Sequence, residues 1–226
     1  MTHRLPLFPL GTVLFPGLVL PLHVFEERYR ALVRHIVDQP DGTPREFGVV
    51  AIERGWEVDH DTGSSASLSL HEVGCSAQIQ QVTEHPDGRF DLVTVGHRRF
   101  RIASVDPSSQ PYLTAEVDWL DETDGRPGEV ERLTPAVLDL FQRYLRLVRP
   151  DEAGEQVPED PTVLSHLIAA TAALSLPDRQ ALLASPDTAS RLRAERLLLG
   201  REVALLQRVR AVPVQLSELA VASSPN

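Results

Sequence analysis

Apolar and polar positions divide the opening of the chain into two short apolar runs. The stretch from Leu5 to Val24 contains no aspartate, glutamate, lysine or arginine. Four prolines interrupt it: Pro6, Pro9, Pro16 and Pro21. Because each proline removes a backbone donor and clashes with the preceding helical turn, the stretch cannot form a continuous membrane-spanning helix. The pattern predicts instead two strands that serve the core, 5–10 and 18–24, separated by an exposed Pro-Gly turn.

Helical spacing takes over directly after this stretch. Apolar side chains recur three or four positions apart and would form one face of a helix: Phe25, Tyr29, Leu32, Val33 and Ile36. Glutamate and arginine side chains between residues 26 and 34 fill the other face. The spacing predicts an amphipathic helix that packs against the two strands.

Further β-type runs, separated by turn residues, continue up to residue 120. They are rich in β-branched and aromatic residues and cover 46–54, 75–84, 89–95, 97–105 and 112–120. The second and third runs flank Pro-Asp-Gly at 86–88, and Asp-Gly tolerates the positive φ of a tight turn, so they predict a β-hairpin. In the fourth run, Phe100 and Ile102 would share one face of the strand, and Arg99 and Arg101 the other.

The pattern changes after a Gly/Pro-rich acidic linker at residues 121–133. Three dipeptides place a capping oxygen before a proline, which is typical of helix starts. They are Thr134-Pro135, Asp160-Pro161 and Ser185-Pro186. Apolar residues at helical spacing follow each of them and predict a helical bundle over 134–212, with a C-terminal tail over 213–226. We therefore predict an α+β fold, in which a β-rich subdomain with one packed helix, 1–120, precedes the bundle.

An ordered set of motifs runs through most of the chain. It comprises LPLFPLGTVLFPG and LPLHVFEERYRALV within 5–33, GCSAQI at 74–79, HRRFRI at 97–102 and the helical segment around 176–206. Together these motifs resemble the Lon N-terminal, substrate-binding domain family. The resemblance implies a PUA-like β-barrel followed by a helical bundle, and recognition of unfolded or degradation-prone protein segments. Because the chain ends after the predicted bundle, we expect a stand-alone form without the ATPase and peptidase domains of Lon proteases.

Composition excludes two kinds of catalysis. All 22 basic residues among the 226 are arginine. A Walker A site and a Ser-Lys peptidase dyad both need a lysine ammonium group, so neither chemistry can occur on this chain. The single cysteine excludes an intramolecular disulfide and favours a cytoplasmic location.

Other catalytic and metal sites find little support. Ser165 and His166 lie in a predicted helix without a G-x-S-x-G elbow or an obvious acidic partner, which favours a structural histidine. Cys75 lies in an apolar strand, where packing is favoured over reactivity. Asp-His-Asp at 59–61 cannot face one ion from an extended chain and indicates a solvated loop. We therefore predict a protein that is not an enzyme, without catalytic, cofactor-binding or metal-binding residues.

A group of basic residues suggests an alternative function. The group consists of His97, Arg98, Arg99 and Arg101. Because PUA domains bind RNA, the resemblance makes a PUA-like nucleic-acid-binding protein the alternative. On a chain with a net charge of −10, four basic positions make a poor phosphate-binding surface. Ion pairing with nearby carboxylates is the favoured interpretation, and nucleic acid is not the expected partner.

Apolar residues in predicted loops are the candidates for peptide binding. They are Leu14, Phe15, Pro16 and Trp56. Such residues can line a groove for extended, unfolded segments, and the alternative is that they are buried between barrel and bundle. The expected partners are unfolded proteins or peptides and a separate protease, without a membrane, and the chain is expected to be a monomer or weak homo-oligomer. A ligand site or enzymatic cleft between the two parts is a third hypothesis.

Overall fold

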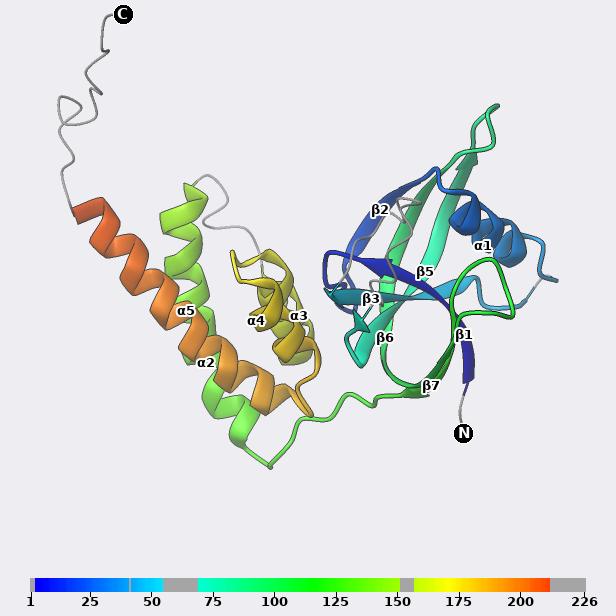
Figure 1. Cartoon of the computed structure of the whole chain (residues 1–226). Helices are drawn as coiled ribbons and strands as arrows, with labels where there is room; N and C mark the ends of the chain where they lie inside the picture. The colour runs from blue at the N-terminus through cyan, green and yellow to red at the C-terminus, as the bar shows by residue number, and fades with distance from the viewer. Residues whose placement is uncertain (1–2, 41, 55–68, 151–156, 212–226) are drawn as a thin grey trace, which may run out of the picture.

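The computed structural model of the chain contains a seven-stranded sheet and five helices within the residues that it describes. These residues are 3–40, 42–54, 69–150 and 157–211. The sheet and its one packed helix lie on one side of the molecule, and the other four helices lie on the opposite side (Figure 1). Trp56, the Asp-His-Asp segment at 59–61 and the predicted tail lie outside the described residues.

The strand pairings form a closed circuit. The strands are β1 (His3–Leu10), β2 (Val19–Val24), β3 (Glu46–Arg54), β4 (Ser69–Leu70), β5 (Val73–Glu84), β6 (Phe90–Asp106) and β7 (Thr114–Trp119). β1 pairs antiparallel with β7, the pairings continue through β6 and β5 to β3, and β3 pairs in parallel with β1. A closed circuit leaves its members without a free edge. β2 and β4 are additions to it, on β6 and β3 respectively.

The β-type runs form strands as predicted, with one difference. β3 has the predicted bounds, and β5 and β6 form the predicted hairpin around Gly88, whose φ is +78°. The runs 89–95 and 97–105 are one strand rather than two, since Gly96 pairs with Ala77 and continues β6. Gly96 is required for a close approach and not for a turn. A Cβ atom there would lie 2.1 Å from the carbonyl oxygen of Phe15.

The opening stretch contains the two predicted strands, but they serve the core unequally. β1 buries most of its apolar side chains, whereas only Val24 of β2 is buried. The prediction that 18–24 serves the core is confirmed for one face, because Leu18, Leu20 and Leu22 are partly buried and pack against the core cluster that contains Val24. The residues of the other face, Val19, Pro21 and His23, are exposed, and among the described strands β2 pairs only with β6. The Pro-Gly turn forms as expected, because Gly17 has a φ of +79° and the Leu18 N–H donates to the Phe15 carbonyl at 3.2 Å.

The amphipathic helix is confirmed as α1 (Glu27–Val37), which packs on the sheet away from the other helices (Figure 1). Tyr29, Leu32, Val33 and Ile36 are buried, as their spacing predicts. Phe25 was predicted on the same face, but it precedes the helix and remains 55% exposed. The N-cap residue is Glu26, so the helical period does not extend back to Phe25.

The remaining helices are α2 (Glu129–Val148), α3 (Pro161–Thr171), α4 (Leu176–Leu183) and α5 (Thr188–Ala211). The predicted start at Asp160 is confirmed, since its side chain accepts the Thr162 and Val163 N–H groups, each at 2.9 Å. The predicted start at Thr134 is wrong. α2 begins at Glu129, and the Thr134 hydroxyl donates back to the Val130 carbonyl at 2.7 Å.

The last helix also begins later than predicted. Its first turn is capped by Asp187, which accepts the Ser190 N–H at 2.7 Å, and not by Ser185. Ser185 donates instead to the Ala181 carbonyl at the end of α4. In the part of the chain that the structure describes, no helix combines the length and apolar character needed to cross a membrane.

The sheet and the helices share one apolar core. Leu182 and Leu183 of α4 and Ala169 of α3 belong to the same cluster of buried residues as the inner side chains of the sheet. α2, α3 and α5 bury a second cluster among themselves, centred on Phe141, Ile168 and Leu199. The contact between sheet and helices is therefore apolar over much of its area, and a group of charged side chains lies within it.

Candidate functional site

The candidate peptide-binding residues are placed differently from what the sequence predicts. Leu14 and Phe15 are buried, with 6% and 0% exposure, so neither side chain lines a groove at the surface. The physical reason is Gly96, whose missing side chain lets the Phe15 backbone lie directly on β6. Pro16 is half-buried, and Trp56 lies outside the described residues. The alternative interpretation, burial between the two parts of the molecule, is correct for Phe15. Its ring centroid lies 6.1 Å from that of His166 on α3.

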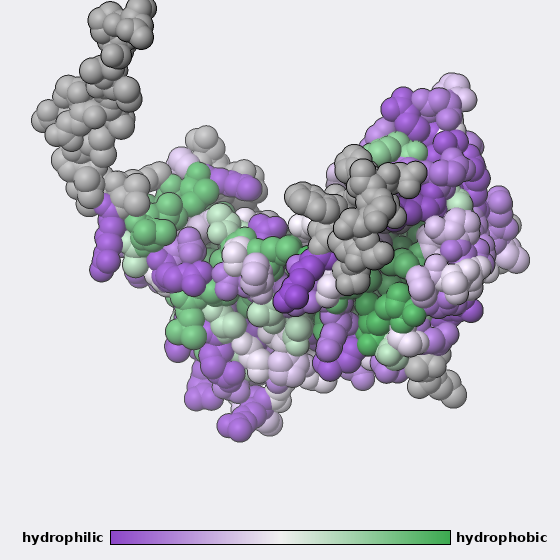
Figure 2. Space-filling model, viewed as in Figure 1, coloured by the Kyte–Doolittle hydropathy of each residue, from purple (hydrophilic) through white to green (hydrophobic). Residues whose placement is uncertain are grey.

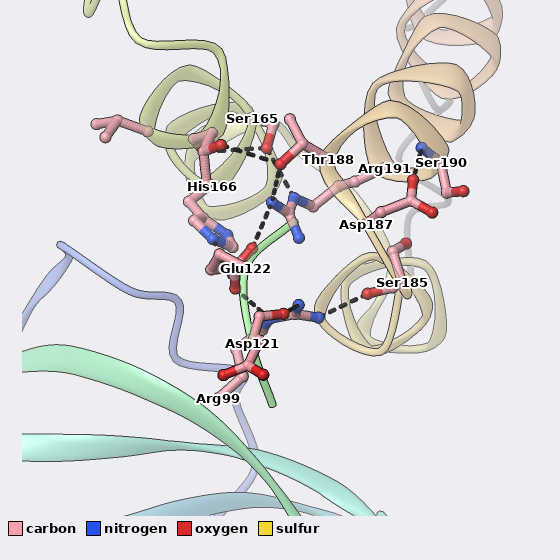
Figure 3. Close-up of polar contacts among 12 residues, drawn as sticks. Arg99, Asp121, Glu122, Ser165, His166, Ser185, Asp187, Thr188, Ser190 and Arg191 are labelled. Carbon is pink, nitrogen blue, oxygen red and sulfur yellow. Dashed lines mark hydrogen bonds and ion pairs between the residues drawn. The ribbon is translucent and has the colours of Figure 1, made fainter. Parts of the chain in front are cut away.

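A buried polar cluster joins the sheet to the helices (Figure 3). Arg99 of β6 is 1% exposed and donates to Glu122, which lies in the segment between β7 and α2. Its other donors reach the carbonyl oxygens of Leu183 and Ser185, at 2.8 and 2.6 Å. Arg191 of α5 donates to the second oxygen of Glu122 at 3.2 Å. One carboxylate thus pairs with two buried arginines from two different parts of the fold.

Glu122 is held in its ionised form by this arrangement. Burial alone would raise its pKa, but His166 and the charges of Arg191 and Arg99 outweigh burial and lower the pKa to about 2. His166 has its own pKa lowered, chiefly by burial. The cluster therefore places an anion between two cations and beside a neutral imidazole, an arrangement that stabilises the contact between sheet and helices.

A second carboxyl group lies at the edge of the same cluster. Glu195 of α5 is fully buried, and neither of its oxygens has a hydrogen-bond partner among the described residues. Burial raises its pKa well above the usual value, against the attraction of Arg191. A buried carboxyl group without hydrogen bonds is costly when ionised, so Glu195 makes the folded chain sensitive to pH.

The geometry around Ser165 and His166 does not support nucleophilic catalysis. No acidic residue lies near His166 at helical spacing, but the structure brings Glu122 to 3.5 Å from its Nε2 atom. Ser165, however, donates to the Thr162 carbonyl and accepts from Arg191 Nε at 2.7 Å. A hydroxyl that is hydrogen-bonded to an arginine and buried has neither a base nor access to substrate. Cys75 is likewise buried, and burial raises its pKa, which disfavours the reactive thiolate.

The basic group on β6 is divided among intramolecular contacts. Arg99 is inside the polar cluster, and the Arg98 guanidinium lies over the Trp119 ring, 4.7 Å from its centroid. His97 Nδ1 lies 3.6 Å from Glu46. Ion pairing with nearby carboxylates, the favoured interpretation, thus describes Arg99, while His97 lies beside a carboxylate. The group is not a continuous phosphate-binding surface, and the nucleic-acid alternative loses the observation that suggested it.

A small apolar groove opens on the opposite part of the sheet, where the end of β1 faces β2. Its volume is about 120 Å³, and it is lined by Phe8, Pro9, Leu10, Leu22, His23, Val24, Phe25, Glu26 and Tyr29. Pockets for drug-sized ligands have volumes of roughly 300–1,000 Å³, and a cavity of roughly 150 Å³ holds a benzene ring. The groove therefore has room for one apolar side chain of a larger ligand.

The strand beside the groove has an unpaired edge. β2 pairs with β6 on one side only, among the strands that the structure describes. The Gly96 N–H donates to the Leu18 carbonyl, and backbone groups alternate in direction along a strand, so Val19, Pro21 and His23 direct theirs away from β6. A proline within a strand is typical of such an edge. The edge, the groove and exposed Phe25 together form what we call the β2 surface.

Sequence reasoning missed both the polar cluster and the β2 surface. Glu122 lies in a predicted linker and Arg191 in a predicted helix, so nothing local indicated that either would meet Arg99. Pro21 was the one signal for the β2 surface, because proline in an apolar strand favours an edge position. In the sequence analysis, Pro21 argues only against a continuous helix.

Apolar surface is also present elsewhere. Figure 2 shows apolar patches on the helical side of the molecule as well as on the sheet. Exposed apolar side chains of α5 include Leu197 and Leu205, at 68% and 54% exposure. Exposure alone therefore does not distinguish the β2 surface. Its groove does, together with a backbone edge that no other described strand pairs with.

Comparisons with known sequences agree with this architecture. The profile of the family described as the ATP-dependent protease La (LON) substrate-binding domain matches residues 4–201. Lon protease 2 of Herpetosiphon aurantiacus is 31% identical over 212 residues, which are 91% of this chain and 25% of the relative. Lon protease 2 of Myxococcus xanthus is 31% identical over 209 residues, 90% of this chain and 24% of the relative. The chain thus spans about a quarter of the length of these relatives.

Solved structures are similar over nearly their whole length. A Lon N-terminal domain protein from Xanthomonas campestris has a TM-score of 0.60 and 27% identity, and covers 87% of this chain and 97% of its own. The N-terminal domain of a Mycobacterium avium complex Lon protease has a TM-score of 0.63 at 20% identity, covering 89% and 98%, and supports the fold alone. The chain belongs to the family of LON substrate-binding domains.

Proposed function

We propose that this chain is a non-catalytic LON-type substrate-binding domain that recognises unfolded or degradation-prone protein segments. The observation that carries the proposal is the match of the family profile across residues 4–201, which includes the sheet, the polar cluster and most of the helices. A role as an adaptor that delivers such segments to a separate protease is part of the proposal. The chain would act in the cytoplasm, as a monomer or weak homo-oligomer.

The proposed architecture follows the same family. The closed circuit of β1, β7, β6, β5 and β3 supports a PUA-like barrel, and the apolar cluster shared by α2, α3 and α5 supports a helical bundle. The polar cluster supports a non-catalytic role, because its serine is hydrogen-bonded to Arg191 and its carboxylate Glu122 is paired with two arginines.

The β2 surface is the proposed binding site. An extended peptide would add as a strand beside β2, where the backbone groups of Val19 and His23 and the Pro21 carbonyl face away from β6. One apolar side chain of the peptide would fill the groove and contact Phe25. Backbone pairing is independent of sequence and the groove accepts one apolar group, so the surface would bind many unfolded segments and few folded ones.

Fluorescence anisotropy with labelled extended peptides tests this proposal. Each peptide would carry a single leucine or phenylalanine in an otherwise polar sequence. We expect Phe25→Ser to weaken binding about tenfold or more, because burying such a side chain contributes roughly 1.5–3 kcal/mol. A peptide with N-methylated backbone positions should bind the unchanged protein more weakly, since it cannot pair with β2.

Leu205→Ser on α5 is the matched control, because Leu205 is as exposed as Phe25 (54% against 55%) but lies far from the sheet. It should leave the affinity unchanged. Equal losses in the two variants would reject the β2 surface as the site. Absence of binding by the unchanged chain to every peptide and to a denatured protein would reject the proposed function itself.

A further inference from the structure

Two histidines and an aspartate meet at one end of the β2–β6–β5 sheet region. His23 Nδ1 on β2 lies 2.6 Å from one oxygen of Asp91 at the start of β6. His85 Nε2, in the turn between β5 and β6, lies 2.6 Å from the other oxygen of Asp91. One ligand atom from each residue lies within 4.8 Å of the other two. All three side chains are at least one-third exposed, so an ion can reach them from solvent.

We propose that His23, His85 and Asp91 form a binding site for a divalent transition-metal ion of the zinc class. Two imidazole nitrogens and one carboxylate oxygen suit Zn²⁺, which binds such atoms at roughly 2.0–2.2 Å, and leave a position for water. Calcium and magnesium prefer all-oxygen sites and would be bound poorly. The metal would take the place of the hydrogen bonds between each imidazole and Asp91.

The backbone holds the three ligands in place before any ion binds. His23 and Asp91 are directly opposite in the β2–β6 pairing, and Thr83, two residues before His85, pairs with Asp91 from the other side. The turn is closed by the His85 N–H bonded to the Arg89 carbonyl and by the Gly88 N–H bonded to the His85 carbonyl, both at 2.8 Å. Ligands on paired strands lose little freedom on binding, which favours affinity.

Arg89 is the charge that opposes this site. Its Nη1 atom lies 3.4 Å from His23 Nε2, while its Nε atom donates to Asp87 at 2.7 Å. If His23 binds a metal through Nδ1, its Nε2 atom carries the hydrogen and can no longer accept from Arg89. Arg89 would then turn away towards Asp87, at a cost to affinity. We therefore expect Arg89→Ala to bind the metal more tightly than the unchanged chain.

Isothermal titration of tag-free protein with Zn²⁺, and absorption spectroscopy with Co²⁺, would test the site. The expected result is one equivalent of saturable binding, with Co²⁺ bands typical of low coordination number. His23→Ala and His85→Ala should each weaken binding at least tenfold, and Arg89→Ala should strengthen it. His97→Ala is the matched control, since His97 is an exposed histidine beside one carboxylate only, and it should change nothing.

Circular dichroism of each variant would establish that it remains folded, as expected for exposed positions. Absence of saturable Zn²⁺ and Co²⁺ binding by the unchanged chain would overturn the proposal. Binding that His97→Ala weakens as much as His23→Ala does would also overturn it, because the ion would then be bound by scattered surface groups. Peptide binding plays no part in this experiment, so its outcome is independent of the proposed function.

Discussion

The sheet has two contrasting borders. At the border with α2–α5, Arg99 is buried and donates to Glu122 and to the carbonyl oxygens of Leu183 and Ser185. At the β2 border, a strand edge is unpaired among the described strands and Phe25 is 55% exposed. The first border buries its charged groups against one another, while the second combines exposed polar groups with apolar surface and a strand edge that is unpaired among the described strands. Buried charged residues therefore mark the structural contact, and the accessible surface is the better candidate for binding.

Arg99→Ala, at the border with α2–α5, should cause the largest loss of stability. It would leave Glu122 and Arg191 in a partly filled cluster and remove the donors of the Leu183 and Ser185 carbonyls. Breaking a buried pair by removing one partner costs about 3–5 kcal/mol, so we expect a loss of that order in the free energy of unfolding. Urea denaturation measures it. Arg101→Ala, an exposed arginine two residues along the same strand, should change stability by less than about 0.5 kcal/mol.

Gly96→Ala should come next, because it forces apart the loop and sheet that bury Phe15. The added methyl group would meet the Phe15 carbonyl oxygen, and overpacking of this kind costs about 1–3 kcal/mol. Thermal unfolding measures the loss. Gly200→Ala is the control, since a Cβ atom there meets nothing within 4 Å and alanine favours the helix. Equal stabilities of the two variants would contradict the close approach at Gly96.

Glu195→Gln should change how the stability of the border with α2–α5 depends on pH. Because burial raises the pKa of Glu195, the folded chain keeps a proton that the unfolded chain releases above the usual value of 4.5. The contribution of Glu195 to stability should therefore fall as pH rises from 4.5 towards the folded pKa, and the difference between the unchanged chain and the variant isolates it from the opposite contribution of His166. Glutamine cannot ionise, so the variant should lose less stability over that window and be the more stable of the two at pH 8. Urea midpoints between pH 4 and 8 measure this, and parallel pH profiles would contradict it.

Phe25→Ser should have the smallest effect on folding. The side chain is exposed and lies before α1, so stability should change by no more than about 0.5 kcal/mol. Differential scanning calorimetry of the variant tests this. A large loss of stability would mean that the Phe25 side chain contributes to the folded core, and the β2 border would then no longer differ from the border with α2–α5.

Local patterns predicted most elements, and long-range contacts escaped them. The buried run at 46–54, the helix through Tyr29 and Ile36, and the Gly88 hairpin all follow from periodicity and turn chemistry within about twenty residues. The cluster of Arg99, Glu122 and Arg191 joins residues from a strand, a connecting segment and a helix, and no local rule pairs them. Phe15 illustrates the same limit, because its burial depends on a glycine in another strand.

The place of Glu122 has a consequence for exchanging parts of this chain. The segment between β7 and α2 has the composition of a hinge, yet it is pinned at several points: besides Glu122, the Thr123 and Asp124 carbonyls accept the N–H groups of Thr188 and Ala189 at 2.8 and 3.2 Å. A chimera joined at residue 121 would keep these contacts but separate Arg99 from its counter-charge. A chimera joined after residue 124 would instead separate the start of α5 from the Thr123 and Asp124 carbonyls. The sheet, the connecting segment and the helices should therefore be transplanted together.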